Sequence, residues 1–238
     1  MKKHIPNTIT CLNLVCGCIS IMTSLHGNLE TAALWIIAAA VFDFLDGFSA
    51  RLFKVSSPIG KELDSLSDVV SFGVAPAMII FVWLSRCFYE MPSLFHESIL
   101  RWLPYTLFLI PALSAVRLAR FNMDERQHTN FIGLPTPANA LFLAFVPYAA
   151  ERVPFLNNFW VVWIFAIGFA LLLVSNINML SLKFKSFDFS GENIVRYVIL
   201  LLGILLFIIF RWSSFPITIL SYLLICLIYH AIIKFQNT

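Results

Sequence analysis

Long apolar runs separated by short polar segments fill almost the whole chain. A helix needs about 20 apolar residues to cross a membrane hydrocarbon core of about 30 Å, and fewer where neighbouring helices shelter it. On this criterion the apolar runs predict eight membrane-spanning helices. They are expected at residues 5–25, 31–53, 63–84, 103–121, 134–150, 159–175, 195–210 and 215–233.

The composition agrees with this pattern. Of the 238 residues, 60% are hydrophobic and 12% are charged, whereas soluble domains have roughly 45–50% and about 25%. We therefore expect an all-α polytopic membrane protein.

The basic start and the first apolar run also suit a signal peptide, but the run is almost long enough to span and has no small-residue cleavage site. This favours a retained first helix.

The distribution of charge predicts how the chain is oriented. The net charge of +3 is small and dispersed, so we expect no nucleic-acid partner. Short cytoplasmic loops are enriched in Lys and Arg. Placing the N-terminus in the cytosol puts most of the 16 Lys and Arg residues on the cytoplasmic side. With an even number of spans, both termini are then expected to be cytoplasmic.

Four aspartates interrupt the apolar pattern in the second and third predicted helices. Charged side chains inside a membrane are costly and usually mark a functional site. At about 100° per residue, Asp43 and Asp46 share one face of the second helix, and Asp64 and Asp68 share one face of the third. A short loop joins the two helices, so they should lie side by side and antiparallel. The four carboxylates are therefore predicted to converge.

Converging carboxylates in a low-dielectric environment repel one another unless cations compensate their charge. Hard oxygen ligands favour Mg²⁺, Mn²⁺ or Ca²⁺, and two such ions can share one site. Small residues on the same faces, Gly47, Ala50 and Gly60, leave room for a ligand near the backbone. The pattern indicates a metal site for a phosphate-bearing substrate. The alternative is polar contacts between helices, but four aligned acids exceed what such contacts need.

These residues form the pattern DxxDGxxAR, eight further residues, and GxxxDxxxD, running from Asp43 to Asp68. This pattern resembles the full signature of the CDP-alcohol phosphotransferases, and the resemblance extends over most of the first 180 residues. It implies a six-helix membrane core at residues 1–182 with a divalent-metal site. Residues 183–238 would then add a C-terminal pair of transmembrane helices to the same integral domain, as a packing or dimer-contact extension.

The flanking segments IPNTITCLNLVCG, RLARFN and FIGLPTPANA look like those of the membrane-embedded phosphatidylserine synthases within that family. This resemblance implies an enzyme that transfers the phosphatidyl group of CDP-diacylglycerol to the hydroxyl of L-serine and releases CMP. Other members of the family use glycerol-3-phosphate or inositol on the same metal site, so these acceptors remain open. The resemblance also implies a homodimer among membrane lipids.

The resemblance assigns roles to named residues. It implies Mg²⁺ or Mn²⁺, as two ions, with Asp68 both as a ligand of the second ion and as the general base. The metal ligands would be Asp43, Asp46, Asp64 and Asp68, and the residues of the CDP-diacylglycerol pocket would be Gly47, Ala50, Arg51, Gly60, Asn7 and Thr10.

For two pairs of residues a second interpretation stays open. Asn7 and Thr10 also suit helix capping after Pro6. Arg117 and Arg120, three positions apart near the end of the fourth predicted helix, would bind the serine carboxylate or a lipid phosphate. They also suit plain anchoring at a cytoplasmic membrane surface.

A transporter also places acids inside membrane helices, and a membrane prenyltransferase also binds diphosphate through Asp-rich motifs. A transporter would not need small residues beside the acids. Prenyltransferases, as a family, carry their two motifs in distant parts of the chain, whereas Asp46 and Asp64 here are 18 positions apart. Both alternatives are therefore less favoured.

Overall fold

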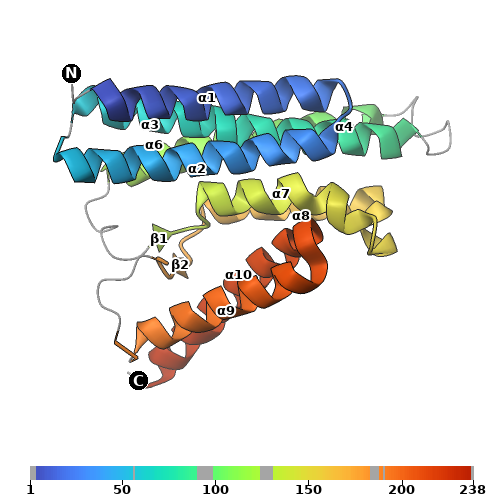
Figure 1. The fold of residues 1–238 in the computed structure, drawn as a ribbon. Coiled ribbons are helices and arrows are strands. Elements are labelled where there is room, and N and C mark those ends of the chain that lie inside the picture. Colours follow the sequence, from blue (N-terminus) through green and yellow to red (C-terminus); the bar gives the residue numbers. More distant parts are fainter. Residues whose placement is uncertain are drawn as a thin grey trace.

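The computed structural model describes residues 4–55, 57–89, 99–123, 131–182, 188–189 and 191–236. These residues are almost entirely helical (Figure 1). In chain order the elements are α1 (His4–Leu25), α2 (Leu29–Phe53), α3 (Pro58–Asp68), the π-helix η1 (Val69–Val74), α4 (Ala75–Tyr89), the 3-10 helix η2 (Ile99–Phe108), α6 (Leu109–Met123), strand β1 (Phe131–Ile132), α7 (Thr136–Ala150), the 3-10 helix η4 (Pro154–Asn157), α8 (Phe159–Leu173), strand β2 (Asn178–Met179), α9 (Glu192–Phe210), the 3-10 helix η5 (Arg211–Ser213) and α10 (Ser214–Gln236).

Each predicted membrane helix coincides with helical structure, and the predicted all-α membrane fold is confirmed. The helices α7 and α8 have 15 residues each, so they are shorter than the usual crossing and rely on shelter from their neighbours. The last long run holds two helices, α9 and α10. Among the described residues, 5 helical runs are long and apolar enough to cross a membrane, namely His4–Leu25, Leu29–Phe53, Pro58–Tyr89, Leu100–Met123 and Glu192–Ile232.

The turn between α2 and α3 determines where the acidic residues gather. α2 ends at Phe53, and Lys54 follows in the left-handed conformation (φ 52°), which lets the N–H of Val55 donate back to Ala50 O at 3.0 Å. Ser57 then caps α3 by accepting a hydrogen bond from Gly60 N at 3.1 Å, and Pro58 occupies the first turn, where its missing N–H removes no helical bond. The end of α2 and the start of α3 therefore lie at one end of the molecule (Figure 1).

α1 packs along α2 and against the continuous helical run formed by α3, η1 and α4 (Figure 1). The approach is closest at Gly17, where an added Cβ would lie 2.5 Å from Ser71 Oγ and 2.8 Å from Ser71 Cα. The Ser20 hydroxyl donates to Ala32 O at 2.8 Å and joins α1 to α2. Glycine and serine thus allow the backbones of these helices to approach each other closely, as is common between membrane helices.

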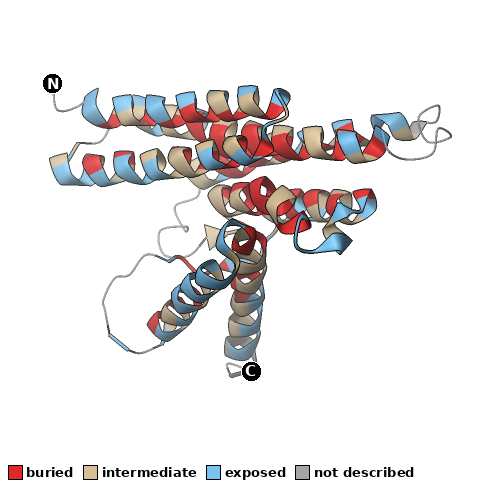
Figure 2. Ribbon diagram, turned by 45° about the vertical axis from the view of Figure 1, so that its right-hand side comes forward, coloured by how far each residue is buried: buried red, intermediate tan, exposed pale blue. Residues whose placement is uncertain are grey.

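The buried residues form two apolar clusters on the inward faces of the helices (Figure 2). One cluster joins α2 and α4 to α7 and includes Ile36, Ile79 and Phe145. The other joins α4, α6, α7 and α8 and includes Ile110 and Leu143. α4 and α7 contribute to both clusters, so these two helices form the centre of the apolar core.

The C-terminal helices α9 and α10 form a hairpin that contacts α7 and β2 through α10. α10 returns toward the end of the molecule at which α1 begins (Figure 1). The predicted domain boundary at 182/183 adjoins residues 183–187, which lie outside the described residues, and it stays a prediction. Also outside them are basic residues used for the predicted orientation, namely Lys2, Lys3, Arg126, Lys183 and Lys185.

Candidate metal and substrate site

The structure brings three of the four predicted acidic ligands together. Asp43 lies on α2, while Asp64 and Asp68 lie one turn apart on α3. One carboxylate oxygen of each lies within 4.8 Å of the others. Asp68 is the most enclosed of the three, with 8% of its surface exposed. Carboxylate oxygens at this spacing form a donor set that suits hard divalent cations.

The fourth aspartate, Asp46, lies beside this cluster and faces a pocket. Its Oδ2 atom and the Oδ1 atom of Asp64 are buried, and neither accepts a hydrogen bond from the described residues. A buried carboxylate oxygen without a partner is costly, because it has lost water without gaining a replacement. Both oxygens therefore suit a cation as their missing partner.

The pocket beside the acids has a volume of about 290 Å³ and lies between α1, α2 and α3. Asp64 belongs both to this pocket and to the carboxylate cluster, so the two form one continuous site. Most of the residues predicted from the signature line it. The lining residues are Pro6, Asn7, Thr10, Asp46, Gly47, Ala50, Val55, Ser57, Gly60, Lys61 and Asp64.

The two pocket glycines meet different surroundings. An added Cβ at Gly47 would have Arg51 Nη1, at 3.9 Å, as its nearest neighbour, so the space beside Gly47 is open. At Gly60 an added Cβ would lie 3.0 Å from Ser57 Oγ and 3.1 Å from Asn7 Oδ1, so this backbone is tightly packed. Arg51 is exposed and is not among the lining residues of the pocket, although its Nη1 lies near Gly47, which is one of them. Gly47 thus leaves room for a ligand, whereas Gly60 lets α1 approach α3.

The alternative capping role of Asn7 and Thr10 fits the structure poorly. Both residues lie inside α1, which begins at His4, and the Thr10 hydroxyl donates to Pro6 O at 3.0 Å within that helix. Both side chains also line the pocket. Their position is compatible with the predicted contact to the nucleotide.

Asn13 is part of this site, although the sequence did not single it out. It is completely buried on α1, and its Nδ2 donates to Asp68 Oδ1 at 3.2 Å. Two serines hold α1 in this register: Ser67 donates to Thr10 O at 3.0 Å, and Ser71 donates to Asn13 O at 2.9 Å. The sequence does carry a signal for Asn13, because polar residues recur along one face of α1. Asn13 therefore orients the carboxylate of Asp68.

The π-helix η1 follows Asp68 directly and was also not predicted. Such a wider turn inserts one residue into a helix and changes the direction of the side chains beyond it. Gly73 accommodates the close packing that results, because its added Cβ would lie 3.2 Å from both Pro111 Cα and Ser114 Cβ on α6. The π-helix thus brings α6 close to the helix that carries two of the acids.

The predicted arginine pair separates in the structure. Arg117 is buried, and its Nη1 donates to Thr136 Oγ1 at 2.7 Å. Arg120 is exposed, and its Nη1 lies 3.4 Å from Val174 O. Positions three apart in a helix share a face, but the long side chains of Arg117 and Arg120 extend from that face in different directions. The interpretation as plain surface anchoring fits Arg120 better than the buried Arg117.

Further buried polar atoms without a hydrogen-bond partner among the described residues lie on α6 and α7. They are Ser114 Oγ, Arg117 Nε, and both side-chain polar atoms of Asn139. Ser114 and Arg117 are one turn apart on α6, and Thr136 and Asn139 are one turn apart on α7. Polar groups without partners therefore occur at the carboxylate cluster and on the two helices that hold Arg117.

Comparison with known proteins agrees with this arrangement. The family model described as CDP-alcohol phosphatidyltransferase matches residues 3–174. A CDP-diacylglycerol–serine O-phosphatidyltransferase of Bacillus subtilis is 33% identical over 151 residues, which are 63% of this chain and 79% of that protein. The protein of the same name from Mycobacterium tuberculosis is 32% identical over 186 residues, 74% of this chain but 60% of that protein. An archaetidylserine synthase of Methanothermobacter thermautotrophicus is 36% identical over 142 residues, 59% of this chain and 56% of that protein.

The fold and the site together define an almost entirely helical membrane protein with a carboxylate cluster beside a pocket. The matched residues, 3–174, contain the whole acidic signature and both arginines. The chain belongs to the CDP-alcohol phosphatidyltransferase family. This membership decides against the transporter and the prenyltransferase.

Proposed function

We propose that this protein transfers the phosphatidyl group of CDP-diacylglycerol to the hydroxyl of L-serine and releases CMP. The observation that carries the proposal is the cluster of Asp43, Asp64 and Asp68 oxygens within 4.8 Å, opening on the pocket between α1, α2 and α3. The reaction type follows from family membership, and the serine acceptor follows from the bacterial relatives that act on serine by name.

The four aspartates are the proposed ligands of two divalent cations, Mg²⁺ or Mn²⁺. The partnerless buried oxygens of Asp46 and Asp64 support this assignment, because a cation would satisfy both. When bound, such cations neutralise charge on a diphosphate and on the departing nucleotide phosphate. The chain itself supplies the oxygens in a fixed arrangement on two packed helices.

The pocket is the proposed binding site of the nucleotide part of CDP-diacylglycerol. Open space beside Gly47 lets the substrate approach the backbone of α2, and Ala50, one turn away, keeps that face small. Asn7 and Thr10 offer polar groups from α1 on the opposite wall. Arg51, next to Gly47, offers a cation to a phosphate, and Gly60 belongs to the lining of the pocket.

Asp68 is the proposed general base. Its carboxylate accepts the proton of the serine hydroxyl, and the hydroxyl oxygen forms a bond to the phosphorus that carries diacylglycerol. The bond between that phosphorus and the CMP oxygen breaks, and CMP leaves with the electron pair. Asn13 holds one Asp68 oxygen by its hydrogen bond of 3.2 Å, which leaves the other oxygen to face the hydroxyl.

Arg117 is the proposed partner of the serine carboxylate, with Arg120 in a supporting role at the surface. The buried position of Arg117 supports this, because an arginine in a low-dielectric environment binds a carboxylate more strongly than one in water. The Nε of Arg117 has no hydrogen-bond partner among the described residues. The Nε–H group of this guanidinium is therefore available to donate to a substrate carboxylate.

The protein is proposed to lie in the cell membrane with both termini and the site facing the cytosol. At the end of the molecule with the site lie Arg51, Lys54, Lys61, Arg117, Arg120 and Arg196, whereas Arg86, Arg101, Arg152 and Arg211 lie at the other end. This excess of positive charge at one end supports the cytoplasmic assignment. Assembly as a homodimer is proposed from the family resemblance alone.

The acceptor is tested with the purified full-length protein in detergent micelles that contain CDP-diacylglycerol and Mn²⁺ or Mg²⁺. Serine, glycerol-3-phosphate and inositol are offered separately, and CMP release and the lipid product are measured. We expect phosphatidylserine with serine only, and no CMP release when a chelator removes the metal. A lipid product with glycerol-3-phosphate or inositol only would overturn the serine assignment and retain the reaction type.

A further inference from the structure

The C-terminal hairpin lies outside the residues matched by the family model, which end at residue 174. Two polar side chains of this hairpin nevertheless bond to the segment that follows β2. We propose that Arg196 and Tyr222 are positioning residues, which hold the strand pair β1–β2 and thereby fix the Arg117 guanidinium in the acceptor site. The proposal rests on the function proposed above.

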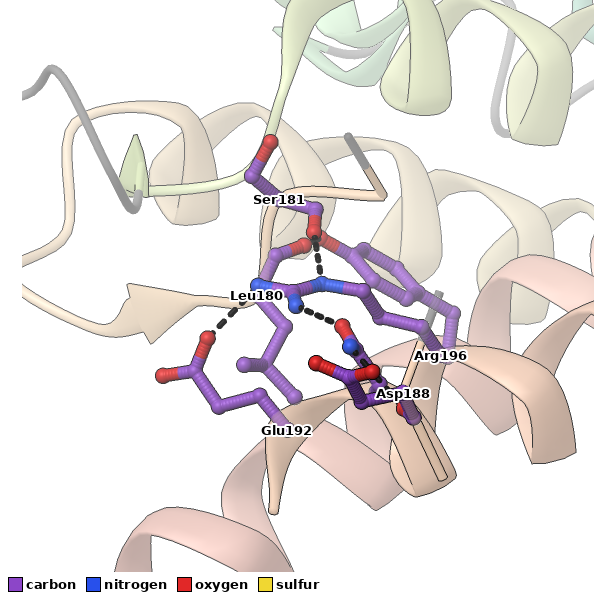
Figure 3. Close-up of polar contacts among 7 residues, drawn as sticks. Leu180, Ser181, Asp188, Glu192 and Arg196 are labelled. Carbon is purple, nitrogen blue, oxygen red and sulfur yellow. Dashed lines mark hydrogen bonds and ion pairs between the residues drawn. The ribbon is translucent and has the colours of Figure 1, made fainter. Parts of the chain in front are cut away.

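The first step of the argument is the contact between the hairpin and residues 180–181 (Figure 3). Arg196 on α9 is 6% exposed, and its Nε donates to Ser181 O at 2.7 Å. Its other nitrogens donate to Asn193 Oδ1 at 2.7 Å and to Glu192 Oε2 at 2.6 Å. A buried guanidinium with all three of these bonds is held in one orientation. It therefore fixes the backbone at Ser181.

A second bond from the same hairpin lies one residue away. Tyr222 on α10 is 6% exposed, and its hydroxyl donates to Leu180 O at 2.8 Å. Leu180 and Met179 are themselves fully buried. The two consecutive carbonyls of Leu180 and Ser181 are thus bonded by two different helices, α9 and α10, and the end of β2 is fixed from both.

The strand pair carries this constraint toward Arg117. β2 pairs antiparallel with β1, with Met179 opposite Phe131. Gly133 N continues the pairing by donating to Ile177 O at 2.8 Å. Gly133 has φ +78°, and an added Cβ there would lie 2.4 Å from Leu173 O, so only glycine fits this crossing. The segment from β1 to α7 is thereby held against the end of α8.

Two of the groups that contact the Arg117 guanidinium belong to this segment, and a third, the Phe121 ring at 5.8 Å, lies one turn further along α6 itself. The Arg117 Cζ lies 5.9 Å from the centre of the Phe131 ring, on β1. Arg117 Nη1 donates to Thr136 Oγ1 at 2.7 Å, in the first turn of α7. Moving β1 would shift the ring and the start of α7 together. The guanidinium position therefore depends on the strand pair, and the strand pair depends on the hairpin.

The hairpin has a separate attachment at its other end, and this attachment provides a control. Ser213 in η5 donates its hydroxyl to Tyr148 O on α7 at 3.0 Å, and Phe215 stacks on Phe145 with ring centres 4.4 Å apart. Ser213 and Tyr222 both bond to a backbone carbonyl through a hydroxyl. They differ in position, because Ser213 attaches the hairpin to α7, whereas Tyr222 attaches it to the segment after β2.

The test measures the KM for serine, the KM for CDP-diacylglycerol, kcat and the thermal midpoint of the purified full-length protein. Tyr222→Phe removes only the hydroxyl, and we expect the KM for serine to rise about three- to tenfold. Arg196→Gln should raise it further, and Arg196→Lys should restore part of the loss. The KM for CDP-diacylglycerol should change less than twofold. Ser213→Ala should lower the thermal midpoint without changing the KM for serine.

A double-mutant comparison isolates the coupling to Arg117. In a protein that already carries Arg117→Lys, Tyr222→Phe should change the KM for serine less than twofold, because its effect acts through Arg117. An unchanged KM for serine in both Tyr222→Phe and Arg196→Gln would overturn the proposal, and so would an equal rise in Ser213→Ala. If the wild type uses another acceptor instead of serine, the serine assignment fails, and the KM for that acceptor decides the positioning role.

Discussion

Asn13 lies outside the acidic signature, yet its amide donates to Asp68, the proposed base. The residue is completely buried, and its Oδ1 has no hydrogen-bond partner among the described residues. A buried amide oxygen without a hydrogen-bond partner lowers the stability of the folded protein. Its position beside Asp68 gives it a physical role, because a hydrogen bond to a carboxylate fixes which oxygen faces the substrate.

Asn13→Ala should therefore lower kcat about ten- to hundredfold, the range expected for losing a hydrogen bond to a charged group. The binding of CDP-diacylglycerol should change little. Asn158→Ala is the matched control, because Asn158 caps α8 by accepting from Trp160 N at 2.9 Å, away from the site. The control should lower the thermal midpoint and keep kcat. Equal kcat in both variants would refute a role for Asn13.

A substitution at Gly47 tests the proposed substrate pocket at a single residue. Its added methyl group would meet no described atom closer than 3.9 Å, and alanine is a better helix former by about 1 kcal/mol. Gly47→Ala should therefore keep or raise the thermal midpoint while the KM for CDP-diacylglycerol rises at least tenfold. A variant with an unchanged KM would show that the substrate does not approach α2 at this position.

At the scale of helices, the site depends on how closely α1 packs against the run from α3 to α4. Gly17 and Ser71 make the closest approach, and the hydrogen bonds of Ser67 and Ser71 to α1 lie beside it. These contacts set the register that brings Asn13 to Asp68. The π-helix η1 belongs to the same region and directs Gly73 toward α6.

Gly17→Ala should separate these helices, because its Cβ would lie 2.8 Å from a backbone atom, Ser71 Cα. Overpacking of this kind costs about 1–3 kcal/mol, so the thermal midpoint should fall by several degrees and kcat should fall with it. Gly168→Ala is the control, because an added Cβ on α8 meets nothing within 4 Å. If both variants behaved like the wild type, the close contact would not determine the site.

Sequence periodicity predicted the elements well because membrane helices follow one strong rule, the length of the apolar run. The 100° step placed Asp43, Asp64 and Asp68 on facing sides of two helices, and their oxygens lie together in the structure. The π-helix was not predicted, because its residues, VVSFGV, continue the apolar pattern of an ordinary helix. The separation of Arg117 from Arg120 was not predicted either, because it depends on Thr136 and Val174 from distant segments.

At the scale of the whole molecule, the described structure combines a helical core, which carries the acids and the pocket, with a hairpin attached at both of its ends. The acids come from α2 and α3, the proposed base Asp68 is oriented from α1, and Arg117 comes from α6. No single helix contains the site. Its geometry is therefore a property of the packed bundle, and Figure 1 shows these helices side by side.

The most direct test of the central claim is the rate of phosphatidylserine formation by Asp68→Asn, measured beside CDP-diacylglycerol binding in the same purified protein. Asparagine keeps the shape of the side chain but cannot accept the serine proton. We predict that the rate falls at least about 10²–10⁴-fold, the range for a lost general base, while CDP-diacylglycerol still binds within a few-fold of the wild-type affinity. Turnover close to that of the wild type would contradict the account.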